Sequence, residues 1–452
     1  MRDLLADTAE RAARHLTSLP DRRVAPAPDA VRALAHLDEP FPDHSTDPSD
    51  VVATLDALVT PATIGIPGPR FFGFVAGGAL PAALAANWLA GAWDQNTVYA
   101  TVTPGVVKLE AVALRWLLEI FGLPSTCGAA FVTGATVANF SALAAARHVV
   151  LERAGWNVEA DGLYGAPPIT VVVGAEVHPS VTKSLGMLGL GRSRVVTIPV
   201  DDQGRMRPDR LPTLDGPAIV CTQVGNVNTG ASDAVREICE RVRDSGAWVH
   251  VDGAFGLWAR AAPAHAHLVE GVQLADSWAT DAHKWLNVPF DSGLAFVRDG
   301  EALRSAMAVA AEYLPPTGPV RNPGEYTPEL SRRARGAEVW AALKQLGREG
   351  LADLVERNCR LATRFAEGLA AAGHEILNDV VLNQVLVSFG PPEVTNRVIA
   401  DLQADGTCWC GGTVWQGRTA MRISVSCWMT DEADVDRSLA VMLRLAERHG
   451  GP

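Results

Sequence analysis

Short apolar runs alternate with helix-length segments between residues 60 and 310, and this alternation restricts the fold more than any other feature of the sequence. Apolar and polar residues do not alternate regularly within these runs, which are AAFVTGA, ITVVVGA, SRVVTIPV, AIVCTQVG, AWVHVDG and GLAFVRD. Apolar strands that are separated by helices form a mostly parallel sheet covered on both faces. The sequence therefore predicts an α/β large domain with such a sheet over residues 61–310.

Three further regions flank this domain. Residues 1–60 are polar and helical in pattern and end in a joint rich in Pro and Asp, so we expect an N-terminal helical arm. Residues 311–329 contain five prolines and two glycines, which exclude a regular helix and favour a mobile loop. Mixed helical and strand patterns over residues 330–452 predict a small α+β C-terminal domain.

Charge and composition exclude several classes of protein. The 39 basic and 51 acidic residues give a net charge of −12, which argues against a nucleic-acid or membrane-surface partner. The most apolar stretch, from Leu80 to Trp93, is shorter than the roughly 20 residues that cross a membrane. The start of the sequence lacks the apolar core of a secretory signal. The cysteines lack zinc-binding spacing, so no metal site is predicted. We expect a cytoplasmic protein that binds a small molecule.

Lysine is scarce, which narrows the search for amine chemistry to four residues. Lys108 and Lys344 lie in amphipathic helical patterns, and Lys183 follows a helix start. Lys284 instead follows a predicted strand in DSWATDAHKWLNVP. Asp252 ends the predicted strand AWVHVD, and in open α/β sheets the carboxyl ends of strands face the ligand crevice. One crossover connection between the two residues can place them at neighbouring strand ends.

A carboxylate and a lysine at such strand ends suit pyridoxal 5'-phosphate (PLP). The lysine amine forms the Schiff base, while the carboxylate keeps the pyridine nitrogen protonated so that the ring can accept electrons. A buried structural ion pair is an equal alternative on these two residues alone. In FVTGATVAN, a strand ends at Thr133 and a helix begins near Thr136, where free N–H groups can hold a phosphate.

Six motifs occur in a fixed order. They are PRFFGF (69–74), TPGVVKLE (103–110), FVTGATVAN (131–139), EVHPSVTKS (176–184), HVDGAF (250–255) and DAHKW (281–285). Together they resemble the PLP-dependent group II amino-acid decarboxylases, which have the aspartate-aminotransferase fold (fold type I). The resemblance covers about residues 60–440 and implies a lyase that removes the α-carboxylate of an L-amino acid to give an amine. GATVAN departs from the serine-rich phosphate turn that is usual in this family.

The resemblance assigns roles to individual residues. Lys284 would form the Schiff base, and Asp252 would contact the pyridine nitrogen. His178 would stack on the ring, although a buried histidine or a helix start is the alternative. Further residues would hold the phosphate, pack beneath the ring or lie near its hydroxyl: Ala135, Thr136, His283, Ala254 and Asn226.

A tyrosine in the Pro-rich loop bears on the reaction class. The decarboxylases carry a loop tyrosine near the position of Tyr313, and it helps to return a proton to the α-carbon after carbon dioxide leaves. Tyr326 in the same loop is the alternative donor. An aminotransferase or a carbon–carbon lyase would use the same cofactor, and Tyr313 favours the decarboxylase because transamination needs no such loop donor. A catalytically inactive binding protein on the same fold is a third class, against which the presence of Lys284 and Asp252 argues.

The resemblance also implies a homodimer with its active site at the interface. Phe71, Phe72 and the segment 92–96 would then line a pocket that two subunits share. Arg422 matches a position where related enzymes often have an arginine. It would either bind the substrate or have a structural role.

Overall fold

The computed structural model describes residues 1–309 and 320–450, and the chain divides into two compact units. Unit 2 comprises Ala79–Arg360 and Asn378–Gln384, and unit 1 comprises Met1–Gly78, Leu361–Leu377 and the chain from Val385 onward. Unit 1 thus combines the first helices with C-terminal segments, whereas the sequence analysis divided the chain into consecutive ranges. Within the described residues, no helix is both long enough and apolar enough to cross a membrane.

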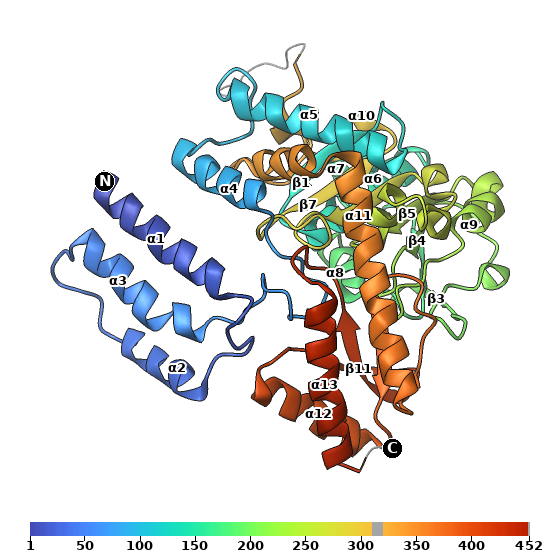
Figure 1. Ribbon diagram of the computed structural model, residues 1–452. Coiled ribbons are helices and arrows are strands. Elements are labelled where there is room, and N and C mark those ends of the chain that lie inside the picture. Colours follow the sequence, from blue (N-terminus) through green and yellow to red (C-terminus); the bar gives the residue numbers. More distant parts are fainter. Residues whose placement is uncertain (310–319, 451–452) are drawn as a thin grey trace. The chain divides into compact units, whose positions relative to one another are not determined.

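Unit 2 is built on a seven-stranded sheet with the order β1-β7-β6-β5-β4-β2-β3. Figure 1 labels β1, β3, β4, β5 and β7 of this sheet. Strand β7 is antiparallel to both of its neighbours, and the other strand pairs are parallel. The predicted mostly parallel sheet is therefore confirmed. The strands are β1 (Gly128–Val132), β2 (Thr170–Gly174), β3 (Val196–Ile198), β4 (Ala218–Gln223), β5 (Trp248–Asp252), β6 (Ser277–Asp281) and β7 (Gly293–Val297).

Helices precede, connect and follow these strands. Those of unit 2 are α4 (Pro81–Trp93), α5 (Pro104–Phe121), α6 (Ala135–Glu152), α7 (Val158–Asp161), α8 (Pro179–Met187), α9 (Val235–Val242) and α10 (Gly300–Met307). Helix α11 (Arg335–Ala371) begins in unit 2 and ends in unit 1, and its backbone leaves helical geometry at Gly347.

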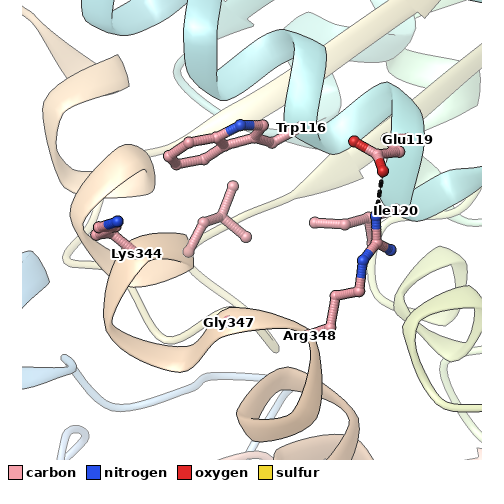
Figure 2. Close-up of a pocket in the computed structure, with 7 residues that line it drawn as sticks. Trp116, Glu119, Ile120, Lys344, Gly347 and Arg348 are labelled. Carbon is pink, nitrogen blue, oxygen red and sulfur yellow. Dashed lines mark hydrogen bonds and ion pairs between the residues drawn. The ribbon is translucent and has the colours of Figure 1, made fainter.

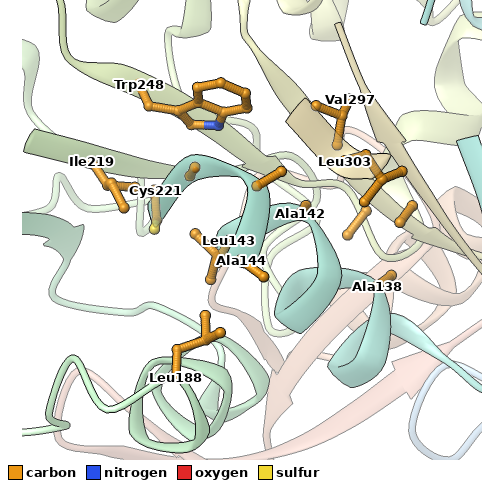
Figure 3. Close-up of a cluster of buried hydrophobic side chains, with 14 of the residues drawn as sticks. Ala138, Ala142, Leu143, Ala144, Leu188, Ile219, Cys221, Trp248, Val297 and Leu303 are labelled. Carbon is orange, nitrogen blue, oxygen red and sulfur yellow. The ribbon is translucent and has the colours of Figure 1, made fainter. Parts of the chain in front are cut away.

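Helix α6 lies at the centre of the large hydrophobic core of unit 2 (Figure 3). Its buried side chains include the run from Ala142 to Ala146, whose small residues let the helix backbone approach the sheet closely. Ile219, Trp248 and Val297, from three different strands, belong to the same cluster. Packing in this core therefore fixes the start of α6 against the strand ends that form the candidate site.

Unit 1 contains helices at both ends of the sequence and a small sheet with the order β10-β11-β9-β8. Arg11 pairs with Asp56 at 2.8 Å and so joins α1 to α3 in the predicted N-terminal arm. The elements are α1 (Arg2–Ser18), α2 (Pro28–Ala33), α3 (Pro48–Leu58), β8 (Glu375–Ile376), β9 (Gln384–Ser388), α12 (Pro392–Asp405), β10 (Gly411–Trp415), β11 (Arg418–Ser424) and α13 (Glu432–Arg448).

Candidate active site

Lys284 lies just beyond the end of β6, beside a buried carboxylate. Its Nζ is 3.0 Å from Oδ2 of Asp281, whose side chain is only 3% exposed. The other oxygen of Asp281, Oδ1, accepts a hydrogen bond from the backbone N–H of Ala135 at 2.6 Å. Ala135 is the first residue of α6. Asp281 therefore joins the lysine to the start of this helix.

Asp252 ends β5, the strand next to β6, and is held by groups from three directions. Its Oδ2 accepts hydrogen bonds from Nδ2 of Asn139 at 3.2 Å and from Oγ of Ser180 at 3.4 Å, and its Oδ1 accepts from the N–H of Ala254 at 3.2 Å. Since Ala254 O also accepts from the N–H of Asp281 at 2.9 Å, it connects the two strand ends directly. The carboxylate is thus fixed and buried.

One turn of α6 connects the lysine side of the site to the Asp252 side. Ala135 and Asn139 are four residues apart and so lie on the same face of the helix, about 6 Å apart along its axis. The first contacts Asp281, which pairs with Lys284, and the second contacts Asp252. The predicted juxtaposition of an amine, a helix start and a carboxylate is therefore present in unit 2.

The close packing that permits this arrangement depends on two glycines. A Cβ on Gly293, at the start of β7, would lie 2.4 Å from the Cα of Gly134. No side chain fits in that space, so a larger residue would push β7 away from the start of α6.

His178 stands at the amino end of α8 and caps that helix. Its Nδ1 accepts a hydrogen bond from the N–H of Ser180 at 3.2 Å and lies 2.8 Å from the Ser180 Oγ. Because Ser180 also contacts Asp252, the histidine and the carboxylate share one partner. His178 thus has the helix-start role that the sequence left open, and its position beside Asp252 also suits contact with a bound ring.

A buried line of polar groups continues from Asp252 to the other end of β5. Asn139 Oδ1 lies 2.8 Å from Nε2 of His250, and Nδ1 of His250 lies 2.9 Å from Oγ of Ser277. Nε1 of Trp248 donates to the same Oγ at 2.8 Å. The line begins at the indole N–H of Trp248, which can only donate, and ends at the carboxylate of Asp252, which can only accept. Each hydrogen bond between them is therefore donated in the direction of Asp252. Burial lowers the pKa of His250 to about 3, so the ring stays neutral as this order requires.

The side chains of His283 and Asn226 already form hydrogen bonds within the chain. The Nδ1 of His283 accepts from the N–H of Ser292 at 3.1 Å, which leaves its Nε2 facing Asp281 at 3.7 Å, and burial lowers its pKa. Asn226 donates to Glu176 at 2.9 Å, and its Oδ1 accepts from two backbone N–H groups of the following turn. His283 is thus at the start of α6, whereas Asn226 stabilises its own loop.

The remaining predicted site residues belong to α6, to unit 1 or to the part of the chain that the structure does not describe. Thr136 follows Ala135 on α6, and its carbonyl accepts from Ser184 Oγ at 2.9 Å. Phe71, Phe72 and Arg422 belong to unit 1, where Phe71 stacks on a tryptophan, Phe72 packs edge-on against a phenylalanine, and burial lowers the pKa of Arg422. Tyr313 lies outside the described residues.

Tyr326, the alternative proton donor, is fixed within unit 2. Its side chain packs against the core cluster around α6. The Arg321 guanidinium lies over its ring, 4.1 Å from the centroid, and Arg321 itself is 3.5 Å from the buried Glu110. These contacts favour a structural role for Tyr326.

The lining of a separate pocket between α5 and α11 contains none of the predicted site residues (Figure 2). Its volume is about 310 Å³, and an ion pair between Glu119 and Arg348 crosses one end. The residues that line it are Trp116, Glu119, Ile120, Leu343, Lys344, Gly347 and Arg348.

The residues around Lys284 and Asp252 fit PLP. The start of α6 has N–H groups that suit a phosphate, of which that of Ala135 binds Asp281. Lys284 offers an amine, and Asp252 offers a fixed carboxylate to a protonated ring nitrogen. Four residues that complete this centre were not predicted from the sequence: Asn139, Ser180, His250 and Asp281.

Comparisons with known proteins agree with this geometry. Residues 28–390 match the pyridoxal-dependent decarboxylase conserved domain. The chain is 24% identical over 454 residues to an aromatic-L-amino-acid decarboxylase of Bacillus atrophaeus, covering 95% of this chain and 92% of that protein. It is 23% identical to a phenylacetaldehyde synthase of Arabidopsis thaliana over 90% of this chain and 87% of that one.

A solved structure has the same fold. The crystal structure of Oryza sativa TDC with PLP and tryptamine matches 99% of this chain and 97% of its own, with a TM-score of 0.91 and 22% sequence identity. The predicted fold class, an α/β PLP-dependent transferase-like fold, is therefore confirmed.

Proposed function

This chain belongs to the pyridoxal-dependent decarboxylase family, and on that premise we propose that it converts an L-amino acid to the corresponding amine and carbon dioxide. It is a carboxy-lyase, and its cofactor is PLP. The observation that carries the proposal is the single turn of α6 that holds Asp281 beside Lys284 at one end and Asp252 at the other.

The bound cofactor supplies a protonated pyridine ring that accepts the electron pair left behind when carbon dioxide departs. The chain's own groups prepare this chemistry. Lys284 would bind the cofactor covalently, and the start of α6 would hold its phosphate. Asp252, oriented by Asn139 and Ser180, would keep the ring nitrogen protonated. His178 would cover one face of the ring and exclude water from it.

Measuring the products that form from each substrate tests this activity directly. We would supply single L-amino acids to the PLP-loaded enzyme and measure carbon dioxide, amine, aldehyde and keto acid. The panel begins with aromatic amino acids, because two relatives are named for an aromatic substrate or product. Carbon dioxide with an equal amount of amine supports the proposal. A keto acid without carbon dioxide would instead show an aminotransferase.

Aldehyde formation is the second candidate function, favoured by the similarity to a phenylacetaldehyde synthase. Here the α-carbon is oxidised after carbon dioxide leaves: one O₂ is reduced to hydrogen peroxide, water is consumed, and the products are an aldehyde and ammonia. A proton donor at the α-carbon opposes this outcome. We place Tyr313 in that role, because Tyr326 is fixed against the core.

We expect Tyr313→Phe to retain carbon dioxide release while amine yield falls by about tenfold or more, since positioned proton donors contribute about 10²-fold or more. Hydrogen peroxide and aldehyde should account for the missing amine. The measurement is the ratio of amine to carbon dioxide under air. Tyr326→Phe is the matched control and should keep the ratio near one. An unchanged ratio in Tyr313→Phe would assign the proton to another group.

We further propose a homodimer that covers the exposed face of α4. Three large apolar side chains on this helix face solvent: Trp88 is 46%, Leu89 is 53% and Trp93 is 43% exposed. A cluster of this kind marks an interface more often than a bare surface. The active site would lie at this interface, next to residues 92–96.

The dimer proposal predicts that Leu89→Asp raises the dimer dissociation constant by about thirtyfold or more, because a charge in an apolar interface must be desolvated. Sedimentation equilibrium at several concentrations measures this constant. Val414→Asp is the control, since Val414 is 71% exposed on β10 of unit 1. A wild-type chain that is monomeric at micromolar concentration would contradict the proposal.

All seven cysteines are free thiols, and six of them are buried. Free thiols in this number are typical of a reducing compartment, and on this ground we assign the enzyme to the cytoplasm.

A further inference from the structure

Asp281 occupies the start of α6 with a carboxylate, at the place where the cofactor needs to bind its phosphate. We propose that Asp281 competes with the phosphate of PLP for this helix start and thereby weakens cofactor binding by the chain. The proposal rests on the PLP dependence described above, and it adds a residue that regulates how readily the site is loaded.

The start of α6 is built to bind an anion, yet the helix provides none itself. Gly134 precedes it and has no side chain to cap it, and its first turn contains no acidic residue. The free N–H groups and the helix dipole favour a negative charge there. Asp281 supplies that charge from β6, with Oδ1 at 2.6 Å from Ala135 N. A phosphate that binds the same N–H must therefore replace the carboxylate.

The two partners of Asp281 are the two groups that PLP requires. Oδ1 binds the helix start, which the phosphate needs, and Oδ2 binds Lys284 Nζ, which the cofactor's aldehyde needs. Cofactor binding thus removes both hydrogen-bond partners from a carboxylate that is 3% exposed, and leaves Nε2 of His283 at 3.7 Å. A buried carboxylate that loses its hydrogen bonds is strongly unfavourable, so Asp281 must either move or oppose the phosphate.

Asp281 and His283 both lie close to Gly134, the residue that precedes α6. A Cβ built on Gly134 would lie 3.5 Å from Oδ1 of Asp281 and 3.3 Å from Cε1 of His283. His283 is itself held by Ser292 and by the ring of Phe290, whose centroid is 4.5 Å away.

The test compares PLP with pyridoxal, which has the same ring and aldehyde but no phosphate. Wild-type and Asp281→Asn protein would be freed of cofactor and titrated with each compound, with binding followed by absorbance and by quenching of tryptophan fluorescence. Asn keeps the shape and the acceptor oxygen but removes the charge. We expect the dissociation constant for PLP to fall by about tenfold or more in the variant, and that for pyridoxal to change by less than about threefold.

The comparison separates the phosphate from the lysine. Equal changes for PLP and pyridoxal would overturn the proposal, because Asp281 would then act on Lys284 alone. Weaker PLP binding by Asp281→Asn would also overturn it, because the carboxylate would then support the phosphate. A wild-type protein that binds neither compound would contradict the proposed function instead.

Asp276→Asn is the matched control. Asp276 precedes the same strand, β6, at its opposite end, and its Oδ2 likewise accepts a backbone N–H, that of Val249, at 2.8 Å. This variant loses a partly buried carboxylate that likewise holds a backbone N–H, but it should leave the affinity for PLP unchanged. Asp281→Ser, a smaller uncharged acceptor, is the second variant and should bind PLP more tightly than the wild type if Asp281→Asn does not fold.

Discussion

Lys284→Ala is expected to lose the absorbance of covalently bound PLP and to reduce turnover by about 10⁴-fold or more, as removal of a covalent catalyst does in other enzymes. The reason is the position of this amine. Lys284 is the lysine that Asp281 holds at the end of β6, 3.0 Å from a buried carboxylate. Absorbance spectra of the dialysed variant and its rate of carbon dioxide release measure the two effects.

Lys183→Ala is the matched control for this experiment. Lys183 is an exposed residue of α8, so its loss should leave both the spectrum and the rate near those of wild type. Substantial turnover by Lys284→Ala, with PLP still covalently attached, would contradict the assignment and transfer the covalent role to another amine.

The sheet of unit 2 could be predicted because its strands are short, apolar and separated by helices. AWVHVDG became β5 and GLAFVRD became β7. The direction of β7 could not be predicted, because an apolar strand has the same sequence pattern in parallel and antiparallel pairs. The set of segments that form unit 1 could not be predicted either, since this unit combines segments from the two ends of the chain.

Some residues of the candidate site could likewise be predicted from a sequence pattern, whereas others were recognised only from their contacts in the structure. Lys284 and Asp252 could be found because their residue types are rare or placed at strand ends. Asn139 and His250 lie inside the same motifs, FVTGATVAN and HVDGAF, at spacings that place them on the faces of Ala135 and Asp252. These spacings could therefore have indicated both residues from the sequence.

Asp281 was harder to recognise from the sequence. An aspartate three residues before a lysine suggests an ion pair, and that pair is present. Its bond to Ala135, however, joins residues 146 positions apart. The close approach of Gly293 to Gly134 accompanies this bond, and a glycine in a strand does not indicate which residue packs against it.

The line of donors behind Asp252 explains why this carboxylate suits a cationic ring. Trp248, Ser277 and His250 fix the orientation of the Asn139 amide, so that its NH₂ group rather than its oxygen faces Asp252. The carboxylate is therefore held in one orientation. In the proposed function it would face the ring nitrogen, where positive charge must be kept.

Asp252→Asn is therefore expected to reduce the decarboxylation rate per bound cofactor by about 10²- to 10³-fold, because a preorganised charge is lost from the reacting ring. Cofactor attachment at Lys284 should persist, so the spectrum of the bound cofactor separates a catalytic loss from a binding loss. Asp233→Asn is the control: Asp233 is also buried and accepts from the N–H groups of Gln223 and Met206, but it has no role at the ring.

A cofactor analogue can show that the charge itself is what Asp252 maintains. PLP methylated on its ring nitrogen carries a permanent positive charge and needs no carboxylate to keep a proton. The wild-type enzyme loaded with this analogue measures the steric cost of the methyl group. Relative to that reference, Asp252→Asn should lose less than about tenfold. An equally large loss with the methylated and the natural cofactor would mean that Asp252 only positions the ring.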